Sequence, residues 1–243
     1  MKIIGHRGAK GEAPENTLAG FAYLRSLGIH HVELDIHLSV DKQLVVIHDD
    51  TVDRTTNQSG KVRDFTADQL ANMNAHHQWP NWSLPNHPAS ETGIPRLAKV
   101  LTAWHELKSI QLEVKSAPKA ELALIARDLI QLCEDFKLGE RGIITSSSEQ
   151  FHQCLSELHC KQPTGLVADS RVQNPIQTAK DLNCDYLCLD WKLCNDEMVA
   201  AASNAKLTVS LWTANDASWF KTFENWGIDS VITDVPSKWP GSL

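Results

Sequence analysis

Short β-branched, apolar runs alternate with helical stretches along almost the whole chain. The sequence predicts nine strands, at residues 2–5, 31–38, 44–48, 110–115, 142–146, 164–168, 186–190, 207–212 and 230–233. Helices are predicted between most of them. The first is expected to begin with Asn16 as its N-cap, and the others lie at about 120–136, 149–158, 175–182, 196–203 and 217–226. Alternating strands and helices form parallel sheets, so eight such units in 243 residues predict an α/β fold of the TIM (β/α)8 barrel type. A doubly wound open sheet is the alternative.

Nine predicted strands are one more than an eight-stranded barrel contains. The run from Val40 to Gln43 is typical of a tight reversal, and too few residues lie there to form a crossover helix. We therefore expect strand 44–48 to be the antiparallel return of a hairpin, which makes the barrel irregular. If the hairpin turns on Val40 and Asp41, Glu33 lies directly across from His48.

Residues 49–96 do not follow the strand–helix repeat. This segment is polar and contains one short helical pattern, at 66–73. We expect residues 1–243 to form one barrel domain, with this segment as an insertion after the hairpin. Barrel active sites lie at the loops that follow the strands, so the insertion is expected to shape or cover the site. The alternative is a decorative or oligomer-contact loop.

The composition excludes several classes of partner. The net charge is −7 and the Lys and Arg residues form no block, which argues against nucleic acid. No run approaches the ~18 apolar residues of a membrane span, and no signal peptide precedes the first strand, so we expect a cytoplasmic protein without stable membrane insertion. The six cysteines form no C-x-x-C pair and are expected to be reduced thiols. The choice between monomer and homodimer stays open.

Acidic residues interrupt two of the predicted strands. Glu33 and Asp35 share the polar face of strand 31–38, and Glu113 lies on the polar face of strand 110–115. Parallel barrel strands are buried on both faces and are normally almost continuously apolar, so these acids indicate a site. Three converging carboxylates favour a hard divalent cation, Mg²⁺ or Ca²⁺, over zinc.

Basic, imidazole and aromatic residues are expected at the same end of the barrel. Arg7 and Lys115 could neutralise and orient a phosphate, or could only form structural ion pairs with the three acids. His6 and His48 are candidates for a general acid–base pair, because an ordinary histidine pKa of ~6.5 permits both protonation states near neutrality. Trp212 is expected to floor the site against an apolar part of a substrate, with a core position as the alternative.

Several motifs in this order closely resemble those of glycerophosphodiester phosphodiesterases, specifically the signal-less cytosolic bacterial kind within the phospholipase C-like phosphodiesterase superfamily. The resemblance covers nearly the whole chain, and only the motifs together are specific. They are His6-Arg7-Gly8, Pro14-Glu15-Asn16-Thr17, Glu33-Leu34-Asp35, Val46-Ile47-His48-Asp49, Arg54-Thr55-Thr56-Asn57, Leu112-Glu113-Val114-Lys115, Trp212-Thr213-Ala214-Asn215 and Ile232-Thr233-Asp234. The chain departs from the family pattern at Ser147, where a Phe is frequent, and at Ala214, where Val is usual.

The resemblance implies an irregular barrel with a divalent cation held by Glu33, Asp35 and Glu113, and with His6 and His48 as the acid–base pair. It implies hydrolysis of glycerophosphodiesters, such as glycerophosphocholine or glycerophosphoethanolamine, to sn-glycerol 3-phosphate and an alcohol. Whether the nucleophile is a neighbouring substrate hydroxyl, with a cyclic phosphate intermediate, stays open. Two alternatives are a related phosphodiesterase that acts on intact phospholipids and a non-catalytic glycerophosphodiester-binding protein.

Overall fold

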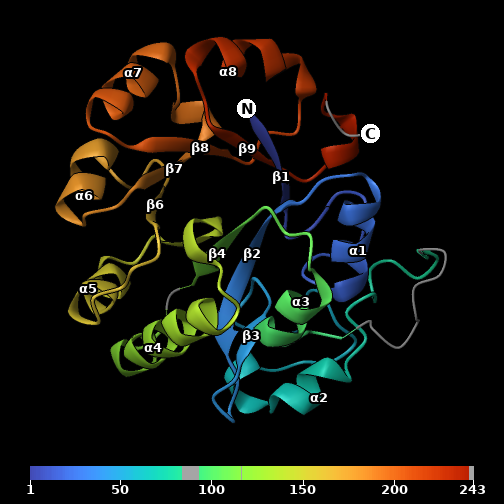
Figure 1. Cartoon of the computed structure of the whole chain (residues 1–243). Helices are drawn as coiled ribbons and strands as arrows, with labels where there is room; N and C mark the ends of the chain where they lie inside the picture. The colour runs from blue at the N-terminus through green and yellow to red at the C-terminus, as the bar shows by residue number, and fades with distance from the viewer. Residues whose placement is uncertain (84–92, 116, 241–243) are drawn as a thin grey trace.

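Eight parallel strands close into a barrel in the computed structural model, which describes residues 1–83, 93–115 and 117–240 (Figure 1). The strands are β1 (Lys2–His6), β2 (His31–Leu38), β4 (Ser109–Val114), β5 (Gly142–Ser146), β6 (Thr164–Ala168), β7 (Tyr186–Asp190), β8 (Thr208–Trp212) and β9 (Ser230–Thr233). They follow the order β1-β9-β8-β7-β6-β5-β4-β2, and β1 also pairs with β2, which closes the ring. The predicted (β/α)8 barrel is confirmed, and the open-sheet alternative is wrong.

Helices cover the outside of the barrel in the connections between its strands (Figure 1). They are α1 (Leu18–Ser26), α3 (Leu97–Ala103), α4 (Lys119–Asp135), α5 (Glu149–Glu157), α6 (Pro175–Asp181), α7 (Asp196–Asn204) and α8 (Phe220–Trp226). The predicted helix at 217–226 begins as a 3₁₀ turn, Ala217–Trp219, before α8. No helix in the described part of the chain is both long enough and apolar enough to cross a bilayer.

The N-cap of α1 differs from the prediction by one residue. Thr17, rather than Asn16, caps the helix, because its side chain accepts a hydrogen bond from the Gly20 amide. Asn16 instead adopts a left-handed backbone (φ 54°) and donates its side-chain amide to Asp35 over 2.9 Å. Asn16, which the sequence predicted as the N-cap of the helix, therefore contacts the predicted acidic cluster.

Alternation along the strands separates an apolar outer layer from a partly polar barrel interior. Leu34, Ile36 and Leu112 are fully buried in the layer between barrel and helices. Inside, the Gln111 amide donates to the Ser210 hydroxyl over 3.0 Å. The six cysteines are free thiols, as predicted.

The ninth strand, β3 (Leu44–Val46), pairs antiparallel with β2, as predicted, but in another register. Leu38 pairs with Leu44 and Ile36 with Val46, so Glu33 does not lie across from His48, which follows the end of the strand. The physical reason is the turn: Ser39 and Gln43 exchange hydrogen bonds around a three-residue tip, and Lys42 in that tip is left-handed (φ 59°). The odd tip length shifts the pairing by one residue.

In the segment predicted to be an insertion, 49–96, the described residues form a small apolar cluster on the far face of β3. The segment contains a 3₁₀ turn (Val62–Asp64) and α2 (Ala67–Ala71), where Thr66 and Gln69 form a capping box. The cluster comprises Val45, Ile47, Val52, Val62, Ala67, Leu70, Met73, Ala75 and Ile94. Residues 84–92 of the predicted insertion lie outside the described part of the chain.

Candidate active site

A pocket of about 680 Å³ opens at the carboxyl ends of the barrel strands, where barrel sites are built. The predicted residues His6, Arg7, His48, Glu113, Lys115 and Trp212 all line it, together with Lys10, Ser147, Val167, Asp169, Arg171, Val172 and Thr213. Glu33 lines a smaller cavity of about 20 Å³ that shares His6, Glu113 and Trp212 with the large pocket. The predicted residues therefore gather at one place.

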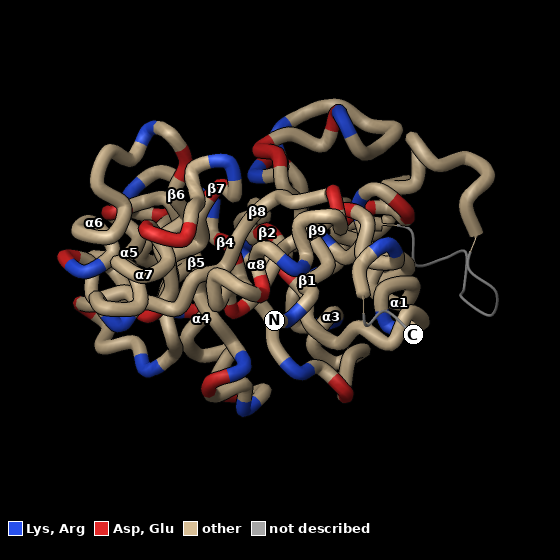
Figure 2. The backbone as a smooth tube through the Cα atoms, turned by 90° about the horizontal axis from the view of Figure 1, so that it is seen from above, with Lys and Arg blue, Asp and Glu red and all other residues tan. Residues whose placement is uncertain are grey.

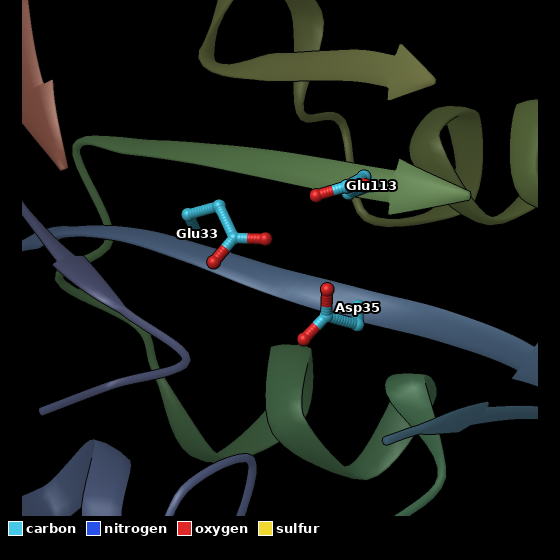
Figure 3. Close-up of side chains that lie close together, drawn as sticks. All are labelled: Glu33, Asp35 and Glu113. Atoms are coloured by element: carbon cyan, nitrogen blue, oxygen red, sulfur yellow. The ribbon is translucent and has the colours of Figure 1, made fainter. Parts of the chain in front are cut away.

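The three predicted carboxylates face one another from adjacent strands (Figure 3). Asp35 on β2 is in register with Glu113 on β4, and Glu33 lies two residues before Asp35 on the same face. One carboxylate oxygen from each of the three residues lies within 4.8 Å of the others. Two of the three are buried and Glu113 is partly buried, so the cluster concentrates negative charge in a place with little water.

Two cations partly neutralise this cluster. The Lys115 Nζ atom lies 2.8 Å from Asp35 Oδ1 and 2.6 Å from Glu113 Oε1, and Arg7 Nε lies 3.1 Å from Asp35 Oδ2. Burial alone would raise the pKa of Asp35, but Lys115 and Arg7 hold it below its ordinary value. Asp35 and Glu113 therefore both form the ion pairs that the structural alternative predicts, which leaves a role as cation ligands open.

No Lys or Arg side chain in the described part of the chain forms an ion pair with Glu33. Its Oε2 atom accepts a hydrogen bond from the Arg7 backbone amide over 3.2 Å, and its Oε1 atom has no hydrogen-bond partner among the described residues. Burial, followed by the neighbouring Asp35 and Glu113 carboxylates, raises the pKa of Glu33 well above its ordinary value. The site thus contains a buried carboxyl group whose ionised form is only partly compensated.

The donor set fits a hard divalent cation. Glu33, Asp35 and Glu113 offer only oxygen atoms, which Mg²⁺ and Ca²⁺ prefer. With all three ionised, Arg7 and Lys115 leave the cluster with one negative charge in excess. One divalent cation would reverse this to one positive charge, which suits an anionic ligand, and would give the Glu33 Oε1 atom a partner.

His6 is held by a carboxylate from the other end of the chain. Its Nδ1 atom donates to Asp234 Oδ1 over 2.6 Å, and the Asn215 side chain donates to Asp234 Oδ2 over 2.8 Å. Although burial alone would raise it, the hydrogen bond and charge of His6 lower the pKa of Asp234 to about 2. The other ring nitrogen, Nε2, lies 3.8 Å from Glu33 Oε2, so it faces the acidic cluster.

His48 has the same kind of support. Its Nδ1 atom donates to Asp49 Oδ1 over 2.6 Å, and the His37 ring donates to its backbone carbonyl over 3.0 Å. Burial lowers the pKa of His48, an effect that the Asp35 charge opposes. Sequence analysis assigned no role to the orienting carboxylates, although Asp49 and Asp234 are the last residues of two of the quoted motifs.

Trp212 lies at the wall that both cavities share. Its indole nitrogen donates to the Cys188 carbonyl over 2.8 Å, which fixes the ring at the end of β8. Lys10 and Arg171 also line the pocket, whereas basic and acidic residues are interspersed over the rest of the backbone (Figure 2). The cations that meet an anionic ligand are therefore those of the pocket itself.

The sequence has relatives that cover almost its full length. The glycerophosphoryl diester phosphodiesterase family matches residues 6–238. YhdW of Bacillus subtilis (strain 168) is 32% identical over 240 residues, which cover 97% of this chain and 95% of that protein. The glycerophosphodiester phosphodiesterase of Caldanaerobacter subterraneus subsp. tengcongensis is 28% identical over 235 residues, 96% of this chain and 94% of the relative.

Solved structures share the same barrel. A phosphodiesterase from Oleispira antarctica, in complex with the product sn-glycerol-3-phosphate, superimposes with a TM-score of 0.85 at 23% identity, covering 98% of this chain and 94% of that one. A glycerophosphodiester phosphodiesterase from Thermotoga maritima has a TM-score of 0.76 at 23% identity, with coverage of 97% and 95%. At these identities the likeness establishes the fold.

Proposed function

This chain belongs to the glycerophosphoryl diester phosphodiesterase family and is a glycerophosphodiester phosphodiesterase, and we propose that it hydrolyses small, water-soluble glycerophosphodiesters with the help of a divalent cation. The candidate substrates are glycerophosphocholine and glycerophosphoethanolamine, and the products are sn-glycerol 3-phosphate and the alcohol. The observation that carries the proposal is one pocket in which two carboxylate-bound imidazoles, His6 and His48, accompany a three-carboxylate cluster. The sn-glycerol-3-phosphate bound to the Oleispira antarctica phosphodiesterase supports the identity of the product.

Glu33, Asp35 and Glu113 would hold the cation, Mg²⁺ or Ca²⁺. When bound there, it supplies Lewis-acid polarisation of the phosphoryl group and a fixed point for orienting the substrate. Arg7 and Lys115 already contact this cluster, so their charges can offset the phosphate charge as it grows in the transition state. Because buried carboxylates hold the Arg7 and Lys115 side chains in place, these two side chains need little reorganisation during the reaction.

The two histidines would divide the proton transfers. Each Nδ1 atom is committed to a carboxylate, Asp234 for His6 and Asp49 for His48, which leaves Nε2 for the substrate. One imidazole takes the proton of the attacking hydroxyl or water, and the other protonates the leaving alkoxide. Trp212 would pack against the carbon atoms of the substrate at the pocket wall. We expect the enzyme to act in the cytoplasm.

The assay is release of sn-glycerol 3-phosphate from glycerophosphocholine, measured with Mg²⁺, with Ca²⁺ and with a chelator. We expect release with one or both cations and its loss under chelation. No release with either cation supplied contradicts the substrate assignment, and undiminished release in chelator contradicts the cation. A parallel reaction with phosphatidylcholine vesicles tests the alternative of intact lipids, from which we expect no cleavage.

A further inference from the structure

We propose that Arg54, together with Glu15, is a positioning residue that fixes the imidazole of His48 through Asp49. This inference rests on the proposed catalytic role of His48. It also gives the insertion at 49–96 a function, because Arg54 lies within that segment and reaches back to the barrel.

Arg54 holds both oxygens of the carboxylate that His48 contacts. Its Nε atom lies 2.6 Å from Asp49 Oδ2, and its Nη2 atom lies 3.2 Å from Asp49 Oδ1. Oδ1 is the oxygen that accepts the hydrogen bond from His48 Nδ1 over 2.6 Å. A planar guanidinium that contacts both oxygens fixes the rotation of the carboxylate, and the carboxylate in turn fixes the imidazole.

The other edge of the same guanidinium is held by Glu15. Arg54 Nη1 lies 2.7 Å from Glu15 Oε2, and Arg54 Nη2 lies 2.8 Å from Glu15 Oε1. Glu15 Oε1 also accepts a hydrogen bond from Arg7 over 2.9 Å, and Arg7 reaches Asp35. A continuous chain of charged contacts therefore runs from His48 to the acidic cluster.

The position of His48 explains why such support is needed. It follows β3 and takes no part in the pairing of that strand with β2, so the sheet does not fix its ring. Asp49 is itself only partly buried, and water would otherwise compete for its oxygens. Within the insertion, the Gln78 side chain donates a hydrogen bond to the Arg54 backbone carbonyl, which helps to fix the backbone position of Arg54.

Lysine cannot replace this arginine. An ammonium group is a point charge that contacts one oxygen at a time in no fixed plane, whereas the guanidinium fork meets two carboxylates at once. We therefore expect Arg54→Lys to preserve the charge but to restore only part of the activity that Arg54→Ala loses.

The test compares Arg54→Ala, Arg54→Lys and the control Arg63→Ala, an exposed arginine of the same insertion. We expect Arg54→Ala to lower kcat on glycerophosphocholine about 10- to 100-fold, the range that loss of an orienting partner usually costs. KM should change less than threefold, the thermal unfolding midpoint should stay within a few degrees, and added guanidinium ion should restore part of kcat. Arg63→Ala should behave as wild type.

A double-mutant cycle with His48→Ala separates positioning from general structural damage. If Arg54 acts through His48, Arg54→Ala costs little more once His48 has been removed, because residues that act as a unit are not additive. An undiminished kcat in Arg54→Ala, or the same fold loss with and without His48, would overturn the proposal. If wild type itself releases no sn-glycerol 3-phosphate, the proposed function has failed instead, so the two failures are distinguishable.

Discussion

His6 Nδ1 lies 2.6 Å from Asp234 Oδ1, a contact that joins β1 to the segment that follows β9. The same distance separates His48 Nδ1 from Asp49 Oδ1. In both cases a carboxylate accepts the Nδ1 proton, which selects one tautomer and orients the ring. The two imidazoles are thus oriented in the same way, although Asp49 is adjacent to His48 in the sequence and Asp234 is far from His6.

Removal of either imidazole is expected to abolish most of the turnover. His6→Ala and His48→Ala should each lower kcat on glycerophosphocholine at least about 100-fold, because a positioned acid or base contributes about 10²–10⁴-fold. His105→Ala, at an exposed position, is the matched control and should leave kcat unchanged. Near-normal turnover in either site variant would remove that histidine from the mechanism.

Loss of the carboxylate behind His6 should slow the reaction with little effect on substrate binding. Asp234→Asn keeps the size of the side chain but removes the charge that selects the Nδ1-protonated tautomer, so we expect kcat to fall about 10- to 100-fold. Asp229→Asn is the control, since Asp229 pairs with Lys2 before β9 begins. Steady-state kinetics of both variants would show the difference, and equal kcat values would contradict the orienting role.

The barrel could be predicted because its signals are local. Each strand and most helices have their own apolar period, so their order alone indicated eight βα units. Helix α3 was missed because Leu97 and Val100 directly follow the polar insertion, and Arg96 before them provides no side-chain cap. The hairpin register was predicted wrongly because it depends on the conformation of Lys42, a non-glycine residue in a left-handed turn.

The acidic cluster was predictable for the same local reason, whereas its orienting partners were not. Glu33 and Asp35 alternate with apolar residues, so they share a strand face whatever the rest of the fold does. Asp234 reaches His6 only because β1 and β9 are neighbours in the barrel, and Glu15 reaches Arg54 only because the segment after β3 returns to the barrel. Such contacts depend on tertiary structure and carry no periodic signal.

The stability of the protein is expected to fall between pH 6.5 and 4, partly because of His31. Burial, together with the charges of Lys2 and Lys108, lowers the pKa of His31 to about 4, and its ring contacts the Ser109 hydroxyl at 2.8 Å. As the pH falls through this window, the unfolded chain takes up a proton that the folded chain refuses, so unfolding becomes more favourable. Below pH 4 both states are protonated and the effect is complete.

The measurement is urea unfolding of wild type and His31→Gln at pH 7 and pH 5. We expect wild type to lose about 1 kcal/mol more than the variant between these pH values. This figure is smaller than the full pKa shift would give, because the ring is partly exposed and solvent screens its interactions. Equal losses in the two proteins would exclude His31 as a source of the pH dependence.

Glu33 is expected to lower the thermal stability of the cation-free protein and to support cation binding. Without a cation its carboxylate is buried beside two others, and no described cation contacts its Oε1 atom. Glu33→Gln removes the repulsion, so in the presence of a chelator it should raise the thermal unfolding midpoint by a few degrees. The same change should weaken Mg²⁺ or Ca²⁺ binding, measured by calorimetry, and lower kcat.

Gln111→Glu, which adds an acid beside Glu33 in the neighbouring strand, should instead lower the thermal unfolding midpoint of the protein in chelator. A lower midpoint for Glu33→Gln, with unchanged cation binding, would show that Glu33 is a structural residue rather than a ligand.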